Sequence, residues 1–199
     1  MLDNLFNSDD RDRHPIPQRN FWLVLAVQFM MLASVPAASI HTQLTGTTLF
    51  LQTAPVDPYD ILRGYYQILG YDISDRNQLK KLPGGKLFDK YKPGVQEFFV
   101  TVTLPNPPAQ IAATAIAVST QKPINLPSNQ LVIRGTFSGG SQLTYGIEKF
   151  YMPEAQQRSV NQDIDRNRSR RNLLVEVKVD SNGHTVPMKL WVGNKSYSF

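Results

Sequence analysis

Three closely spaced aspartates stand in the middle of the chain: Asp57, Asp60 and Asp72. Carboxylate oxygens at short spacing are the ligands that Ca²⁺ prefers. However, Pro55 and Pro58 bracket the first of these aspartates, and the spacing matches no known calcium loop. Aspartate beside proline is typical of turns and of capped backbone amides. The sequence therefore favours turn-forming roles over a metal site.

The remaining metal-ligating residue types give no site either. His14, His41 and His184 are scattered, and no two of them have ligand spacing. The chain has no cysteine, which excludes disulfides and thiolate metal sites. No glycine-rich phosphate loop lies between a strand and a helix. We therefore expect no cofactor, no metal and no catalytic residue.

A serine nucleophile with a lysine base is the catalytic alternative. Membrane signal peptidases use this pair, and they have one N-terminal membrane helix followed by an exported β domain. Burial must lower the pKa of their lysine so that it can act as a base. Here Lys80 and Lys81 lie in a polar stretch, and Ser138 and Ser141 lack the turn that exposes a nucleophile. The residues favour a protein without catalysis, and a Ser/Lys membrane hydrolase stays open as an alternative.

The densest positive charge follows a predicted helix near residue 167. The chain has a net charge of +5, and four arginines gather here: Arg166, Arg168, Arg170 and Arg171. Cations at a helix C-terminus are stabilised by the helix dipole, so a solvated helix end is one interpretation. Contact with lipid headgroups or with an acidic partner is the other. Nucleic-acid binding is not supported, because no platform of aromatic and basic residues accompanies the run.

One long apolar run, Phe21 to Ile40, precedes the candidate strands and would determine where they lie relative to a membrane. It reads FWLVLAVQFMMLASVPAASI and carries no charge. As a helix it would be ~30 Å long, which matches the hydrocarbon core of a bilayer. Gln28 and Pro36 are tolerated in such helices. The sequence predicts a transmembrane helix over residues 21–40.

Flanking charge predicts the orientation of this helix. Arg11, Arg13 and Arg19 precede it, and no lysine or arginine follows until Arg63. The positive-inside rule then makes residues 1–20 a cytoplasmic tail and residues 41–199 an exported domain in the periplasm or a lumen. A signal peptide cleaved near Ala37 remains the alternative.

The exported part is patterned as strands. We expect a mostly β domain of about eight strands, a sandwich or a partly open barrel, with a short helix from Pro153 to about Asn167. The last two strands should form a hairpin around the turn Asp180 to Gly183. Pro187 within the second of them predicts an edge strand, because proline cannot donate to a ladder.

The segment GYYQILGY, residues 64–71, alternates apolar side chains on two faces, which predicts an inner strand. The stretch before it, PVDPYDILRG, is stiffened by Pro58 next to Asp57 and also contains Asp60 and Arg63.

These residues resemble the GDYXXLXY family of membrane-anchored proteins. Gly64, Tyr66, Leu69 and Tyr71 match the pattern, while Tyr65 stands where the pattern has aspartate. Two further segments, KFYMPEA and the closing hairpin, are similar to later parts of the family, so the resemblance spans most of the chain after the anchor.

The resemblance implies a single N-terminal membrane helix, an exported domain and, from frequent gene neighbourhood, a multi-pass membrane partner. The biochemical role of the family is undetermined. Any role of the missing carboxylate is absent here or has moved to Asp60 or Asp72. We expect the exported domain to bind or support a membrane-protein partner. An accessory subunit or assembly factor of a large membrane complex is the third hypothesis.

Overall fold

The computed structural model describes residues 18–55, 66–89, 94–105, 110–138, 143–151, 154–167 and 173–198. Contacts divide the chain into two units, Met1–Ala38 and Ser39–Phe199.

Helix α1 extends over Gln18–Thr45 and is longer than the predicted span. Its apolar residues are exposed, with Phe29 at 73% and Met30 at 72%. Among the described helices, α1 is the one long and apolar enough to cross a membrane, with a mean hydropathy of 2.0 over its span. Residues 41–45 continue the helix beyond the predicted span.

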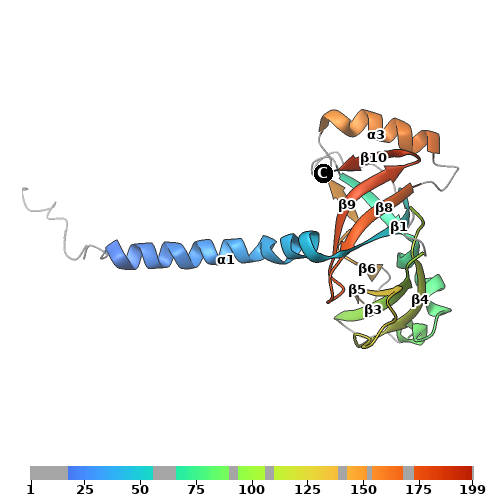
Figure 1. Cartoon of the computed structure of the whole chain (residues 1–199), viewed down its shortest axis with the longest axis horizontal. Coiled ribbons are helices and arrows are strands. Elements are labelled where there is room, and N and C mark those ends of the chain that lie inside the picture. The colour runs from blue at the N-terminus through green and yellow to red at the C-terminus, as the bar shows by residue number, and fades with distance from the viewer. Residues whose placement is uncertain are drawn as a thin grey trace, which may run out of the picture. The chain divides into compact units, whose positions relative to one another are not determined.

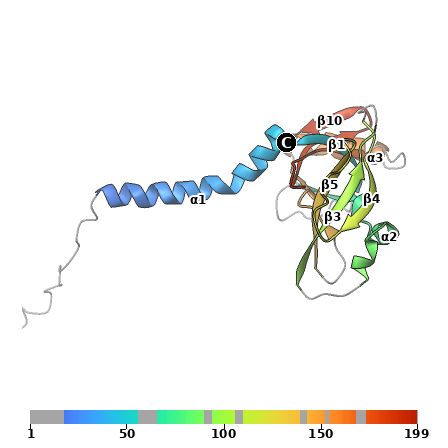
Figure 2. The same cartoon turned by 60° about the horizontal axis from the view of Figure 1, so that its bottom comes forward.

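The domain consists of two antiparallel sheets, as the alternating pattern predicted (Figures 1 and 2). The six-stranded sheet has the order β10-β9-β8-β1-β2-β7, and the four-stranded sheet has the order β4-β3-β5-β6. The strand bounds are β1 Thr47–Pro55, β2 Tyr66–Tyr71, β3 Val95–Thr103, β4 Thr114–Ser119, β5 Gln130–Ser138, β6 Leu143–Thr144, β7 Lys149–Tyr151, β8 Leu173–Val179, β9 Thr185–Val192 and β10 Lys195–Ser198.

The core lies between the two sheets, so the predicted sandwich is confirmed. Strand β8 shows the reason most clearly, because buried and half-buried residues alternate along its whole length. Val175 and Val177 of β8 and Phe98 and Val100 of β3 are each fully buried and belong to one hydrophobic cluster.

The polar stretch after Ser74 contributes to this core, which its composition did not predict. The 3₁₀ turn η1 (Asp72–Ser74), helix α2 (Arg76–Lys80) and the 3₁₀ turn η2 (Gly85–Phe88) follow one another here. Asp75 caps α2 by accepting from the backbone amide of Asn77 at 2.8 Å. This local structure buries Leu79 and Phe88.

Residues 143–151 form two short strands, β6 and β7, which belong to different sheets. The break falls at Gly146, which has a φ of +81° that favours glycine. The carboxylate of Glu148 accepts from the amides of Tyr145 and Gly146, which closes the turn between β6 and β7.

The prediction that Pro187 marks an edge strand is wrong. Strand β9 lies between β8 and β10. Pro187 is tolerated because the β8–β9 register shifts between Glu176 and Val177, where it pairs with Val177. On the other side, the pairing of β10 ends at Lys189, so within the described residues β10 does not pair with Pro187 and does not require its missing amide.

Helix α3, Glu154–Asn167, covers the β9–β10 end of the larger sheet (Figure 1). It buries Val160 and Ile164. The carboxylate of Asp163, which is also buried, belongs to the same contact. The ammonium of Lys195 donates to Asp163 Oδ2 at 2.7 Å, and the hydroxyl of Tyr197 donates to the same oxygen. These hydrogen bonds lower the pKa of Asp163 below its ordinary value.

Candidate functional site

The sequence motif lies on β2, an inner strand between β1 and β7, as predicted. Tyr66 pairs with Tyr151 of β7, and Tyr71 pairs with Thr53 of β1. Several candidate residues lie outside the described part of the chain, and their roles stay predictions: Asp57, Pro58, Asp60, Arg63 and Gly64, together with the side chains of Tyr66 and Leu69.

A groove opens where β2 leaves β1. The pair Thr53 and Tyr71 is the end of their ladder, and the chain then turns into η1. Further back along β1, Phe50 forms a parallel bridge with Ala112, and the amide of Ala113 donates to the Phe50 carbonyl at 2.7 Å. The η1 segment and the segment around Ala112 therefore lie apart, with the intervening residues of β1 between them.

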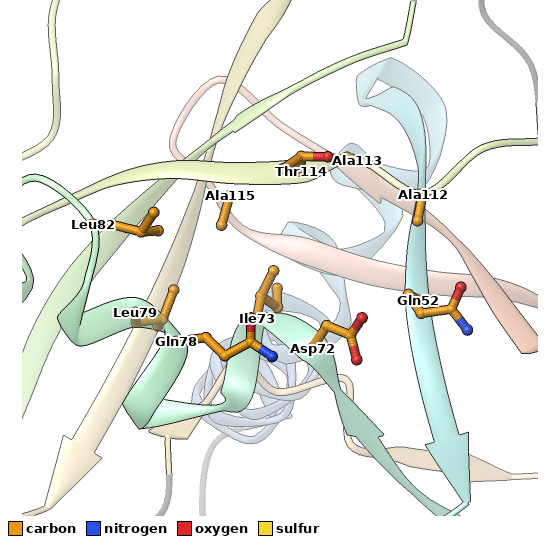
Figure 3. A pocket seen from close by; sticks show the side chains of 10 residues that line it. All are labelled: Gln52, Asp72, Ile73, Gln78, Leu79, Leu82, Ala112, Ala113, Thr114 and Ala115. Atoms are coloured by element: carbon orange, nitrogen blue, oxygen red, sulfur yellow. The ribbon is translucent and has the colours of Figure 1, made fainter. Parts of the chain in front are cut away.

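This opening holds a pocket of about 270 Å³ (Figure 3). In the figure, Gln78, Ile73 and Asp72 lie on one side and the chain from Ala112 to Ala115 lies on the other. A second hollow of about 480 Å³ shares Gln52 and Ala112 with the first and continues towards Ile111, Leu174 and Gly193. We call the two together the Gln52 groove.

The groove is suited to recognition by hydrogen bonds. Its first pocket combines the exposed carboxylate of Asp72 with the amide side chains of Gln52 and Gln78. Small alanine side chains on the opposite side leave room for a ligand. Asp72 is the one acidic or basic residue among these lining residues. A polar or cationic group of a bound peptide would find partners here.

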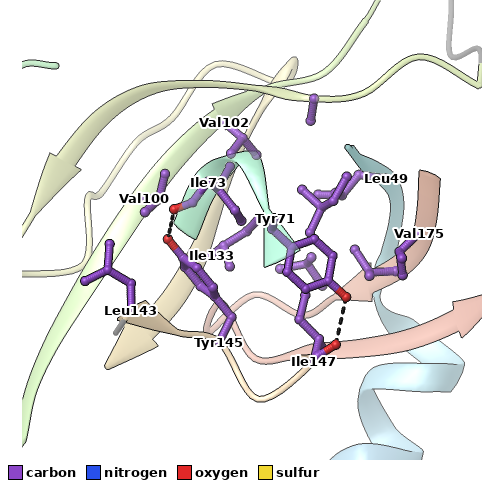
Figure 4. Packing of buried hydrophobic residues seen from close by; sticks show 14 of the residues in the cluster. Leu49, Tyr71, Ile73, Val100, Val102, Ile133, Leu143, Tyr145, Ile147 and Val175 are labelled. Carbon is purple, nitrogen blue, oxygen red and sulfur yellow. Dashed lines mark hydrogen bonds between the residues drawn. The ribbon is translucent and has the colours of Figure 1, made fainter. Parts of the chain in front are cut away.

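Two tyrosines fix the segment that forms one side of this pocket (Figure 4). The hydroxyl of Tyr71 donates to the Ile147 carbonyl at 2.7 Å, and the hydroxyl of Tyr145 donates to the Ile73 carbonyl. Burial, reinforced by the charge of Glu148, raises the pKa of both tyrosines. Both therefore remain protonated donors at neutral pH.

Tyr71 of the motif is thus a packing residue that positions the groove. It is buried, and it directly precedes Asp72. The two tyrosine hydrogen bonds hold both ends of the Tyr71–Ile73 segment against the Tyr145–Ile147 segment. Sequence reasoning missed Tyr145, because its partner Ile73 is distant in the sequence and no local pattern links the two.

A second cluster, which the sequence did not reveal, joins the end of α1 to the β8–β9 turn. The hydroxyl of the fully buried Thr42 donates to Asp180 Oδ2 at 2.9 Å and lies 3.0 Å from His184 Nδ1. Burial alone would raise the pKa of Asp180. Hydrogen bonds from Thr42 and from the backbone amides of Asn182 and His184 nevertheless lower the pKa of this carboxyl below its ordinary value.

The lysines considered for catalysis have surface environments. Lys80 forms an ion pair with Asp89 at 2.9 Å, and Lys81 is exposed. Ser138 is exposed at the end of β5, and Ser141 lies outside the described residues. Within the described part of the chain, no group of three histidines, cysteines or carboxylates could hold a metal ion.

The predicted arginine cluster is described only at its first residue. The guanidinium of Arg166 is 74% exposed and lies 3.9 Å from Asp163 Oδ1, while Arg168, Arg170 and Arg171 are outside the described residues. Its neighbour Asn167 lies against Gly193, at the end of β9. Arg166 is therefore at the end of the β8–β9 hairpin opposite the turn that contacts Thr42.

Comparison with models of protein families shows which family the chain belongs to. The family model described as GDYXXLXY protein matches residues 28–190. The chain belongs to the GDYXXLXY family. The match begins within α1 and ends in β9, so it includes the motif strand, the four-stranded sheet, α3 and the larger sheet apart from the end of β9 and β10. The resemblance drawn from Gly64, Tyr66, Leu69 and Tyr71 is confirmed. Neither the curated proteins nor the solved structures include a significant match to this GDYXXLXY protein.

Proposed function

We propose that this GDYXXLXY protein is a single-pass membrane protein whose exported β domain binds a membrane-protein partner without catalysis. In this proposal α1 is an uncleaved anchor, residues 1–20 face the cytoplasm, and the domain lies in the periplasm or a lumen. The exposed apolar surface of α1 and the arginines that precede it support this topology.

The observation that carries the proposal is the short connection between the apolar run and the domain. The run ends at Ile40 and β1 begins at Thr47. The residues between them span ~9 Å as a helix and ~20 Å when fully extended. The domain is therefore confined to the bilayer surface, where its available partners are proteins embedded in that membrane or attached to it.

The Gln52 groove is the proposed partner site. It is formed where two strands separate, it is lined by a carboxylate and side-chain amides, and the two buried tyrosines keep one side of it in place. An extended loop of the partner carrying a lysine or arginine would satisfy Asp72 while its backbone meets the exposed side-chain amide of Gln78. The side chain of Gln52 would shape the groove, because its amide already donates to the Leu173 carbonyl at 2.9 Å. Arg166 and the arginines after it would offer a second contact to an acidic part of the partner.

Purification of the full chain from its native membrane in a mild detergent tests this proposal. We expect a specific protein to co-migrate with the wild type and to be lost with Asp72→Lys, which reverses the groove charge. Glu97→Lys is the matched control, because Glu97 is exposed on β3 and belongs neither to the groove nor to the arginine cluster. The size of the co-migrating assembly separates a single partner from a large complex in which this chain is an accessory subunit. A chain that runs alone under every gentle condition would overturn the proposal.

A further inference from the structure

The β8–β9 turn lies beside the residues that follow the apolar run. Strand β8 is antiparallel to β1, and Val179 pairs with Thr47 at the start of β1. Beyond Val179 the chain therefore continues past the start of β1 and along the last turn of α1. The hydrogen bonds of Thr42 with Asp180 and His184 are the result. Thr42 follows Ile40 by only two residues, which is ~3 Å of helix.

A second loop is held against this turn. The ammonium of Lys122 donates to Asn182 Oδ1 at 3.4 Å. The turn is also tied to β5, the strand that this loop enters, because the amide of Arg134 donates to the Gly183 carbonyl at 2.9 Å. The loop of residues 121–127 and the turn of residues 180–184 thus form one surface, which we call the juxtamembrane edge.

The juxtamembrane edge exposes a large apolar side chain next to a lysine. Ile124 is 84% exposed, the highest value among the large apolar residues that the structure describes as exposed. Lys122 is exposed beside it, and His184 has a side chain that is 44% exposed. The acidic member, Asp180, has a side chain that is only 12% exposed and is engaged by three hydrogen bonds. The edge therefore presents an apolar tip with a cationic neighbour.

We propose that the juxtamembrane edge rests on the same bilayer that holds α1. Ile124 inserts at the boundary between headgroups and acyl chains, and Lys122 contacts the phosphate of an anionic lipid. A lone apolar side chain next to a lysine is the combination that interfacial binding uses, since the apolar area enters the membrane while the charge remains at the headgroups. This inference rests on the proposed function, because it requires α1 to be embedded.

Site-directed labelling of the full chain in lipid nanodiscs tests the inference, and the absence of native cysteine makes each label unique. Ile124→Cys would carry a spin label, whose exposure to oxygen dissolved in lipid is compared with its exposure to a water-soluble nickel relaxant. Ile111→Cys is the matched control, because Ile111 is 58% exposed and lies near Leu174 and Gly193, at the other end of the β8–β9 hairpin. Met30→Cys in α1 reports insertion of the anchor.

We expect the Ile124 label to be several-fold more exposed to oxygen than to the nickel relaxant, as in the Met30 label, and the Ile111 label to show the reverse. In discs without anionic lipid, or with Lys122→Gln, the Ile124 label should move towards water. A Met30 label in lipid with an Ile124 label in water would overturn this inference alone. An Ile124 label shielded from both relaxants would overturn it in favour of a protein contact, and a Met30 label in water would overturn the anchor and the inference together.

Discussion

Tyr71 and Tyr145 join the two sheets by reciprocal hydrogen bonds. Each hydroxyl reaches the backbone carbonyl two residues beyond the other tyrosine, so Tyr71 bonds to Ile147 and Tyr145 bonds to Ile73 (Figure 4). Tyr71 ends β2 of the larger sheet, and Tyr145 follows β6 of the smaller sheet. The last tyrosine of the family motif therefore acts through the packing of the domain.

Replacing either tyrosine with phenylalanine should destabilise the domain. Tyr71→Phe or Tyr145→Phe leaves a buried carbonyl without its donor, which typically costs about 1–3 kcal/mol. Thermal unfolding of the full chain in detergent would measure each loss. Because both bonds clamp the same two segments, the double variant should lose less than the sum of the single losses. Full additivity would contradict the reciprocal arrangement.

The junction between α1 and the domain should depend on one hydroxyl. Thr42→Val keeps the shape of the side chain but removes the donor to Asp180, so we expect a loss of about 1–3 kcal/mol in domain stability. Thr45→Val is the matched control, because Thr45 is exposed in the same helix and bonds only within the helix, to His41. Thermal unfolding that changes equally in both variants would show that the Thr42 contact has no special role.

Gly135 should resist even the smallest enlargement. A Cβ atom at this position would lie 2.5 Å from Cζ of Phe98 and 2.9 Å from Cε1 of Tyr145. Gly135→Ala should therefore cost about 1–3 kcal/mol through overpacking. In a Phe98→Leu background the same substitution should cost less, because the nearer of the two clashing rings is gone. An equal cost in both backgrounds, measured by denaturant unfolding, would exclude this steric cause.

Alkaline pH should weaken the contact between α3 and β10. Burial and the hydrogen bond to Asp163 raise the pKa of Tyr197 from 10.0 to about 12. Because the folded value is higher than the unfolded one, the stability that Tyr197 contributes is fully present below pH about 10 and is lost as the pH rises through about 12. Tyr197→Phe should reduce the fall in thermal midpoint between about pH 10 and about pH 12. An unchanged pH profile would show that this hydroxyl does not titrate with folding.

Local sequence patterns were enough to predict strands and the pairing of β8 with β9. The alternation in Leu173–Val179 and the turn before Thr185 defined the β8–β9 hairpin, because side-chain period and turn chemistry are local properties. The edge-strand prediction from Pro187 was wrong because it, too, used only local information. The tolerance of Pro187 depends on a register shift and on how far β10 reaches, and neither is encoded in the neighbouring residues.

The candidate site was hidden because it is assembled from distant segments. The groove combines Gln52, Asp72, Gln78 and the residues around Ala112, which come from separate parts of the chain. The sequence offered Asp72 only as one of three spaced aspartates and as a replacement for the carboxylate missing at Tyr65. Tyr71 matched the family pattern, but its partner Ile147 could be found only once both sheets were assembled.

The central claim, that α1 crosses the bilayer and leaves the domain on the far side, is tested most directly by a reporter fused after Phe199. A phosphatase that is active only outside the cytosol and a fluorescent protein that matures only inside it give opposite signals. The account predicts an active phosphatase and a dark fluorescent protein, with the fusion retained in the membrane at its full mass. A fluorescent fusion without phosphatase activity would contradict it.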